Sequence, residues 1–457
     1  MDLLLQHIAH LVTFDDAERE LRDVDVAIAN GRIEAIGTNL EVPAGVRVVD
    51  CSDLLVLPGL INAHQHLYQV ALRAIPELEL APIGPWLGGL GSRCLDWHSK
   101  GLLTPDLVGA VAAAGLLETV LGGVTTVADQ HYLHPAGITI PFVESTIDAA
   151  ARVGVRFHAA RGSLTLGRHN GGTADPGLVQ SVDEVLRHSQ NLIDAFHDPD
   201  PYSMVRVDLA PCGVHADLPV MFDEFAALAD ANANVRLHTH LYEVVDTGFC
   251  NERYAMTPWE FLCEHGWARP ETWLAHVVDP PHDEFAKFAS AGVGVAHLPA
   301  PDLRMGWGYA PVRGMLDAGV TMGFGTTGSA SNDGANLLGD LRLAALGHRT
   351  VIAEPDRWLT ARELLRMATR GSAECLGRPE LGRVQVGAAA DLAAWDMTTI
   401  DRVGVHDPVA GLLLCGLSDR AELVVIAGET VVEHGRHVRL DERVVAHEAR
   451  TLLAPTR

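Results

Sequence analysis

The chain has 457 residues, of which 48% are apolar and 20% charged, a composition typical of a globular protein with a large core. A formal net charge of -25 argues against nucleic-acid and acidic-membrane partners, because phosphate groups would be repelled, and favours a small neutral substrate. Seven cysteines without a CxxC pair indicate a reducing, cytoplasmic location. The first residues lack the features of a signal peptide, and no apolar run reaches membrane-spanning length.

The two ends of the chain have the same texture. Apolar and polar residues alternate over 24–28, and an Asn-Gly pair follows at 30–31, a pattern that predicts a β-hairpin. Similar alternation with turn residues begins near 382. We therefore expect residues 1–55 and 382–457 to form one small β-sandwich domain.

The middle of the chain is predicted to form a second domain over residues 56–381. It contains short apolar runs, the first of which begins at 55, that alternate with segments of helical spacing. The helical segments include 105–121, 180–195 and 360–375. Eight strand–helix alternations predict a (β/α)8 TIM-like barrel. The predicted strands are 55–57, 125–128, 155–158, 205–209, 235–237, 272–275, 292–296 and 320–324.

Histidines gather where these predicted strands end. His64 and His66 follow the first run, and residues two apart in an extended segment point to the same side. The second such pair is His238 and His240, with Glu243 three residues beyond. Both pairs would converge at the C-terminal mouth of the barrel, where barrel enzymes carry out their chemistry.

Two further histidines, His276 and His297, end two more predicted strands. Zinc prefers imidazole nitrogens, whereas magnesium and calcium prefer oxygen ligands. Histidines at the ends of four separate strands therefore predict a metal site with three or four nitrogen ligands. Ordinary surface histidines are the alternative for any single pair.

These motifs resemble those of the amidohydrolase superfamily, in the branch that contains guanine, S-adenosylhomocysteine and triazine deaminases. The tail 382–392 is similar to that branch's return into its β domain. Within the branch, the stretches 128–131, 297–308 and 324–349 look most like bacterial s-triazine hydrolases of the atrazine chlorohydrolase type. The main motifs are Pro58-Gly-Leu-Ile-Asn-Ala-His64-Gln-His66, Leu237-His-Thr-His240-Leu-Tyr-Glu243, Leu274-Ala-His276 and Gly323-Phe-Gly-Thr-Thr327-Gly-Ser-Ala-Ser-Asn332.

The resemblance implies one zinc ion per chain, with Fe²⁺ as the alternative metal, and a homodimer. His64, His66 and His240 would ligate the metal, and Glu243 would be the proton shuttle. His276 would touch the metal-bound water or act as a further ligand. His238 lies on the same face as His240 but deeper in the barrel, where it is either a packed core residue or a metal contact.

One position departs from the deaminase pattern. Deaminases of this branch carry an aspartate at the end of the eighth strand, and this sequence has Thr327. A threonine hydroxyl cannot accept a proton near neutral pH, so the route that delivers a proton to a leaving amine is missing. Thr327 therefore favours leaving groups such as chloride or methanethiolate, unless it marks a damaged site.

Several further residues follow predicted strand ends and are candidates for substrate binding or for supporting the ligands. Trp86 and Trp307 are candidates for an apolar pocket that takes a flat ring. The remaining candidates are Gln130, His131, Thr327 and His297.

The sequence thus predicts a zinc-dependent hydrolase that displaces a chloro, alkylthio or similar substituent from an s-triazine or related N-heteroaromatic ring by metal-activated hydroxide. The alternative is a zinc-dependent deaminase of a purine, pteridine, pyrimidine or triazine. A metal-free assembly or binding protein is a third reading, although such relatives lose the histidines that this chain keeps.

Overall fold

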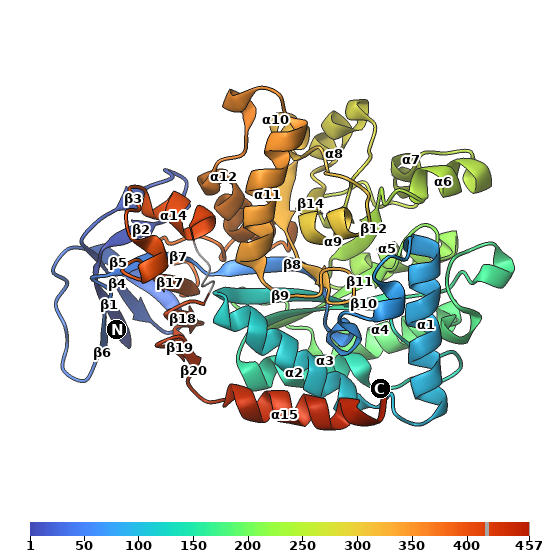
Figure 1. Cartoon of the computed structure of the whole chain (residues 1–457), viewed down its shortest axis with the longest axis horizontal. Helices are drawn as coiled ribbons and strands as arrows, with labels where there is room; N and C mark the ends of the chain where they lie inside the picture. Colours follow the sequence, from blue (N-terminus) through green and yellow to red (C-terminus); the bar gives the residue numbers. More distant parts are fainter. Residues whose placement is uncertain (416–419, 457) are drawn as a thin grey trace.

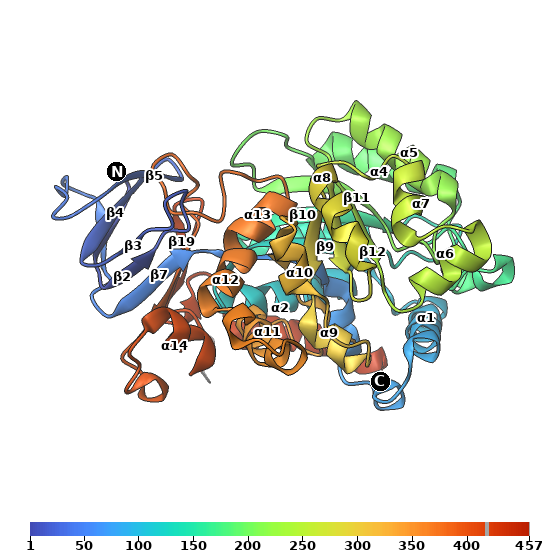
Figure 2. The same cartoon turned by 90° about the horizontal axis from the view of Figure 1, so that it is seen from above.

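A computed structural model describes residues 1–415 and 420–456 of the chain. The described residues form a barrel and, beside it, two smaller sheets built from strands near both chain ends (Figures 1 and 2). None of the described helices has the length and apolar character needed to span a bilayer.

The barrel is the predicted (β/α)8 TIM-like barrel. Its parallel strands pair in sequence order, and the eighth is split into two pieces, of which β15 pairs with β14 and β16 pairs with β8, so that the ring closes. The strands are β8 (Leu60–His66), β9 (Val124–His131), β10 (Arg156–Ser163), β11 (Val205–Pro211), β12 (Leu237–Leu241), β13 (Thr272–His276), β14 (Gly294–His297), β15 (Thr321–Phe324) and β16 (Thr327–Gly328).

The first predicted barrel strand, 55–57, is wrong. These residues belong to β7 (Leu54–Pro58), which pairs antiparallel with β17 (Leu392–Asp396) outside the barrel. Two apolar strands follow each other here with Gly59 between them, so the run alone does not reveal which of the two enters the barrel. The true first strand, β8, extends through the two histidines that were expected to follow it.

The smaller sheets form the predicted β-sandwich from both chain ends. One sheet has the order β5-β4-β1-β6, and the other has the order β20-β19-β18-β17-β7-β2-β3. Apolar side chains of both sheets share one buried core. The strands are β1 (Leu3–Ile8), β2 (His10–Val12), β3 (Glu20–Leu21), β4 (Val24–Ala29), β5 (Arg32–Gly37), β6 (Arg47–Asp50), β7, β17, β18 (Leu423–Ile426), β19 (Glu429–Glu433) and β20 (Arg436–His437).

Helices cover the outside of the barrel. The predicted helix 105–121 is confirmed as α2, 180–195 appears as α4, and 360–375 is a helical stretch made of α12, a π-helical turn at Met367–Gly371 and α13. The longer helices are α1 (Ile83–Ser99), α2 (Pro105–Leu121), α3 (Phe142–Val153), α4 (Val182–Phe196), α5 (Pro219–Ala231), α6 (Asp246–Tyr254) and α11 (Leu337–Val351). The shorter ones are α7 (Pro258–Glu264), α8 (Phe285–Ala291), α9 (Pro299–Arg304), α10 (Val312–Asp317), α12 (Ala361–Arg366), α13 (Ser372–Cys375) and α14 (Pro408–Leu414).

The last helix, α15 (Glu442–Leu453), returns from the sandwich and lies along α2 (Figure 1). This contact explains the sequence of α2, which is apolar on nearly all sides because the barrel covers one face and α15 covers part of another. Just beyond α15, the carbonyl of Thr456 accepts a hydrogen bond from the Trp97 indole of α1 at 3.2 Å. The end of the chain is therefore attached to the barrel and not to the sandwich.

A buried ion pair joins the barrel to the sandwich. The Arg156 guanidinium on β10 binds the Asp391 carboxylate through two contacts of 2.6 and 3.0 Å, and both side chains are at most 3% exposed. The backbone carbonyl of Asp391 also accepts from the N–H of Gly59, between β7 and β8. The connection from β7 to β8 and the segment that leads from α13 to β17 are thus held together at one point.

Candidate metal centre

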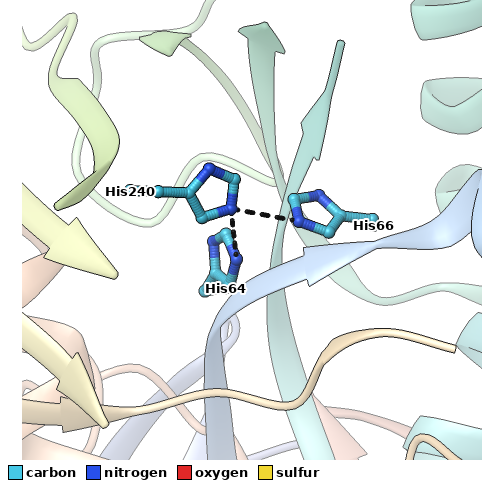
Figure 3. A group of neighbouring side chains, drawn as sticks. All are labelled: His64, His66 and His240. Atoms are coloured by element: carbon cyan, nitrogen blue, oxygen red, sulfur yellow. Dashed lines mark hydrogen bonds between the residues drawn. The ribbon is translucent and has the colours of Figure 1, made fainter. Parts of the chain in front are cut away.

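Three histidines meet at the carboxyl ends of the barrel strands (Figure 3). His64 and His66 come from β8 and His240 comes from β12. The Nε2 atom of His240 lies 3.2 Å from the Nε2 atoms of both other rings. All three side chains are buried, so the predicted convergence of the two His-x-His pairs takes place away from solvent.

The closing strand brings Thr327 to the same place. In β16, Thr327 is paired with Gln65, the residue between the two histidines of β8. The approach is close because Gly325 has no side chain: a Cβ atom there would lie 2.8 Å from the backbone oxygen of His64. The Thr327 hydroxyl is buried and has no hydrogen-bond partner among the described residues, so it is available to a ligand.

Backbone carbonyls fix the proton positions of two rings. His66 donates from Nδ1 to the carbonyl of Gln130 at 2.8 Å, and His240 donates from Nδ1 to the carbonyl of Cys212 at 2.5 Å. A carbonyl oxygen only accepts, so each neutral ring must carry its proton on Nδ1. Each Nε2 atom therefore presents a lone pair to the centre of the cluster.

The side chain of His238 fixes the position of the proton on the His64 ring. It donates from Nδ1 to the carbonyl of Trp273 at 2.9 Å, which leaves its Nε2 atom as the acceptor for the Nδ1–H of His64 at 2.7 Å. His64 then also presents a lone pair on Nε2. Two roles were considered for His238, a packed core residue and a metal contact, and the structure supports the packed core residue. The centroid of its ring lies 4.2 Å from that of the Trp273 indole, on which it stacks, and the ring does not face the centre of the cluster.

The three rings are neutral. Burial, reinforced by the neighbouring imidazoles, holds the pKa of His64 and His240 well below the ordinary value, and burial is also the main reason that the pKa of His66 falls to about 3. Three lone pairs that face one another without a proton between them repel, and a divalent cation removes that repulsion. The donor set fits a borderline-soft ion such as zinc.

A second group of potential ligands overlaps the first. His64, His66 and His240 form one set, while His240, Glu243 and His276 form another. His240 has one free lone pair, on Nε2, because its Nδ1–H donates a hydrogen bond to the backbone carbonyl of Cys212. One lone pair cannot serve two ions, so the two sets describe a single centre with Glu243 and His276 at its open side.

His276 is held in place by an acid. Its Nδ1 atom lies 2.6 Å from Asp302, and its Nε2 atom faces a Glu243 oxygen at 3.6 Å. Burial lowers the pKa of His276, but the charge and hydrogen bond of Asp302 outweigh it, so that the net direction is upward. Burial raises the pKa of Glu243 despite the opposing effect of His276. Glu243 therefore keeps its proton to a higher pH than an exposed glutamate does.

A pocket opens directly above the histidines. The indoles of Trp86 and Trp307 line it together with Thr327, Glu243 and His276, which places these predicted site residues around one cavity. Among the described residues that line it, Glu243 is the only carboxylic acid. The remaining lining residues are His66, Gln69, Ile83, Leu87, Tyr132, Cys212, His215, His240, Pro301, Met305 and Ser331.

Three predicted residues lie behind the pocket wall. Gln130 acts through its backbone carbonyl on His66, and its side chain donates to carbonyls at the end of β11. His131 donates to the carbonyl of Leu133. His297 packs against Phe324 and His348. These three side chains are not among the described residues that line the pocket, and of their two expected roles the supporting one stays a prediction.

Sequence reasoning missed Cys212, His215 and Asp302. Cys212 and His215 follow β11 directly, so the rule that functional residues follow strand ends could have found them. His215 pairs with Asp246 at 2.8 Å, and although burial opposes it, Asp246 raises the pKa of His215 to about 9. Nothing in the sequence pointed to Asp302, because only the folded structure shows that its carboxylate forms a hydrogen bond with His276.

The chain belongs to the amidohydrolase family, whose model matches residues 55–434. It is a hydrolase of that family, with the family's barrel and the cluster of histidines at the barrel's open end.

Three proteins of known name are similar to this chain over most of its length. The chain is 53% identical to the zinc-complexed atrazine chlorohydrolase TrzN from Arthrobacter aurescens TC1, with a TM-score of 0.97 over 99% of this chain and 100% of that chain. It is 36% identical to an 8-oxoguanine deaminase of Pseudomonas aeruginosa over 86% of this chain and 85% of that protein. It is 34% identical to a hydroxydechloroatrazine ethylaminohydrolase of Pseudomonas sp. (strain ADP) over 96% of this chain and 92% of that protein.

The contact between His238 and His64 predicts the behaviour of a variant. His238→Phe keeps a flat ring on Trp273 but removes the acceptor that holds the His64 proton outward. We expect zinc affinity to fall about 10–100-fold, the usual effect of losing such a supporting contact. Competition with a chelator measures the affinity. His348→Phe, which replaces a buried histidine outside the centre, should leave it unchanged. Unchanged zinc affinity in a folded His238→Phe variant would contradict the proposed role.

Proposed function

We propose that this protein is a zinc-dependent hydrolase that displaces a chloro or alkylthio substituent from an s-triazine or related N-heteroaromatic ring. The proposal assigns the zinc ion to His64, His66 and His240. The bound ion would supply Lewis acidity that generates a nucleophile from water near neutral pH. The similarity to a zinc-complexed atrazine chlorohydrolase supports both parts of the proposal.

Glu243 is the residue that we assign to proton donation. Because burial raises the pKa of its carboxyl, Glu243 keeps its proton to a higher pH than an exposed glutamate does and can donate it to a ring nitrogen. Protonation withdraws electrons from the adjacent ring carbon and makes that carbon easier to attack. The indoles of Trp86 and Trp307 provide flat apolar walls for such a ring.

His276 is assigned to orienting the attacking water. Asp302 fixes the ring from its Nδ1 side, so the Nε2 atom points toward Glu243 and the pocket. A ring held in this way can position a water between the histidine cluster and the substrate. The assignment leaves open whether Nε2 also contacts the metal.

One observation favours chloride or a thiolate as the leaving group: the pocket contains Thr327 and only one carboxylic acid among its described lining residues. Glu243 is the one acid among the described pocket residues, and Thr327 offers only a neutral hydroxyl. If Glu243 donates its proton to the ring, no second carboxylic acid among the described pocket residues protonates the departing group. Chloride and thiolates leave without a proton, whereas ammonia does not.

Deamination is the second candidate function, because relatives at 36% and 34% identity include an 8-oxoguanine deaminase and an ethylaminohydrolase. The substrate would in either case be a small neutral heteroaromatic compound. A cytoplasmic location is also part of the proposal, supported by seven free cysteines. The homodimer stays a prediction.

Matched ring substrates test the proposed function. Purified protein with one zinc per chain is given triazines, pyrimidines and purines that differ only in a chloro, methylthio or amino substituent. We expect release of chloride or methanethiol to exceed release of ammonia by about 10²-fold or more, the value of one missing proton transfer. Faster release of ammonia would establish the deaminase instead. Absence of zinc, with no recovery on adding it, would favour the metal-free reading.

The role of Glu243 predicts a loss of turnover without a loss of metal. Glu243→Gln should lower kcat/KM by about 10²–10⁴, because an amide cannot donate the proton, while zinc content stays normal. In the wild type, activity should fall as pH rises through the raised pKa of Glu243, because the acid form disappears. Glu448→Gln, on the surface of α15, is the matched control. A variant with wild-type kcat/KM would remove Glu243 from the mechanism.

Thr327 allows a comparison of charge at constant shape. Thr327→Asp adds the carboxylate found in related deaminases, and Thr327→Asn adds a neutral side chain of the same shape. Both suit the backbone at this position, which is left-handed with φ 58° and strains a β-branched residue. We expect only the aspartate to tighten zinc binding and to raise the ammonia-to-chloride ratio by about 10² or more. Equal ratios in the two variants would show that the carboxylate does not choose the leaving group.

A further inference from the structure

A second polar hollow lies at the opposite end of the barrel strands. It has a volume of about 540 Å³ and lies between the N-terminal ends of β11, β12 and β13, the last turn of α5 and Gly377, the second residue after α13. Of the three metal histidines, His240 lies near the carboxyl end of β12, four residues after Arg236 and about 13 Å away along that strand. The lining residues are Arg206, Ala229, Asp230, Asn232, Asn234, Val235, Arg236, Arg269, Glu271 and Gly377.

Two of these arginines lack a counter-ion. Arg206 is 3% exposed, and its guanidinium contacts only the carbonyls of Gly377 and Pro199, both at 3.4 Å. Its buried Nε–H has no partner among the described residues. Arg236 donates to the carbonyls of Cys375 at 3.1 Å and Pro270 at 2.7 Å. In the described part of the chain, neither guanidinium forms an ion pair with a carboxylate.

The carboxylates nearby are already engaged. Asp208 accepts from His158 at 2.7 Å and from the backbone N–H of Arg236 at 3.1 Å. Glu380 pairs with Arg378, which is fully buried beneath the hollow. At the rim, Arg269 binds both Asp230 and Glu271, at 2.8 and 3.2 Å.

A buried cation without a counter-ion is costly. Burial lowers the pKa of both Arg206 and Arg236, and the neighbouring Arg378 lowers that of Arg206 further; the nearby carboxylate of Asp208 opposes both shifts without reversing either. The chain as a whole carries a formal charge of -25, so an accumulation of unpaired guanidinium groups in one hollow is not a general property of its surface.

We propose that this hollow binds a small tetrahedral oxyanion, phosphate or the phosphate group of a monoester, between Arg206 and Arg236. The planar guanidinium presents paired N–H groups that match the oxygen spacing of phosphate. Polyphosphates and nucleic acids do not suit the site, because Asp230 and Glu271 stand at its rim and would repel further negative charge. Bound phosphate would tie together the ends of three barrel strands and the segment that leads to the sandwich.

Equilibrium dialysis of the zinc-loaded full chain with labelled inorganic phosphate tests the site directly. We expect one phosphate per chain in addition to any that binds at the zinc centre. The thermal midpoint should rise with phosphate concentration more than with chloride at the same ionic strength, because only a ligand of the folded state shifts unfolding in this way. Phenyl phosphate forms a second arm: tighter binding than that of inorganic phosphate identifies a monoester as the ligand, and weaker binding identifies the free ion.

Variants separate this site from the zinc centre. Arg236→Gln should weaken phosphate binding at least about tenfold, because it removes a charge-assisted pair of donors, and Arg236→Lys should weaken it less. Turnover should stay unchanged in both, since the hollow lies at the other end of the strands. Arg152→Gln, which removes an exposed arginine paired with Glu448, is the control. Wild-type phosphate binding in Arg236→Gln, or an equal midpoint shift with chloride, would overturn the proposal.

Discussion

The Nε2 atoms of His64, His66 and His240 converge because the Nδ1 atom of each ring forms a hydrogen bond to a group outside the cluster. Two rings donate to backbone carbonyls, and the third donates to His238, which itself donates to a carbonyl. Those carbonyls belong to residues at the ends of neighbouring strands, so the proton positions follow from the pairing of the barrel. The metal centre is in this sense a property of the closed sheet, and any change in strand register would turn a lone pair into an N–H.

The chemistry proposed for the pocket follows from what surrounds that cluster. Histidine ligands are neutral and add no negative charge to the centre, so the polarising effect of a bound cation is not reduced by its ligands. Among the described residues that line the pocket, Glu243 is the one carboxylic acid, and Thr327 contributes a neutral hydroxyl. An active site with a single carboxylic acid has no second carboxyl group to protonate a leaving amine, and this limit, more than pocket size, separates the two candidate reactions.

The sequence allowed the barrel, the meeting of His64, His66 and His240, and the place of the two tryptophans in the pocket lining to be predicted, because these depend on local period and on the rule that function lies at strand ends. The helix at 105–121 was correct to the residue, although α2 is apolar on nearly all sides and shows little of that period. The strand at 55–57 was misplaced because two apolar strands follow each other there and differ only in their partners. The supporting roles of His238 and Asp302 could not be predicted, since each depends on an atom that lies far away in the sequence.

The path of the chain end has a practical consequence. The N-terminus lies on the sandwich, at one end of the molecule, whereas α15 carries the C-terminus across to the barrel (Figure 1). There the Thr456 carbonyl is bonded to Trp97 of α1, the same helix that supplies Trp86 to the pocket wall. Attachment of the enzyme to a solid support or a fusion partner through its C-terminus would therefore pull on a wall of the pocket. Attachment through the N-terminus would leave that wall free.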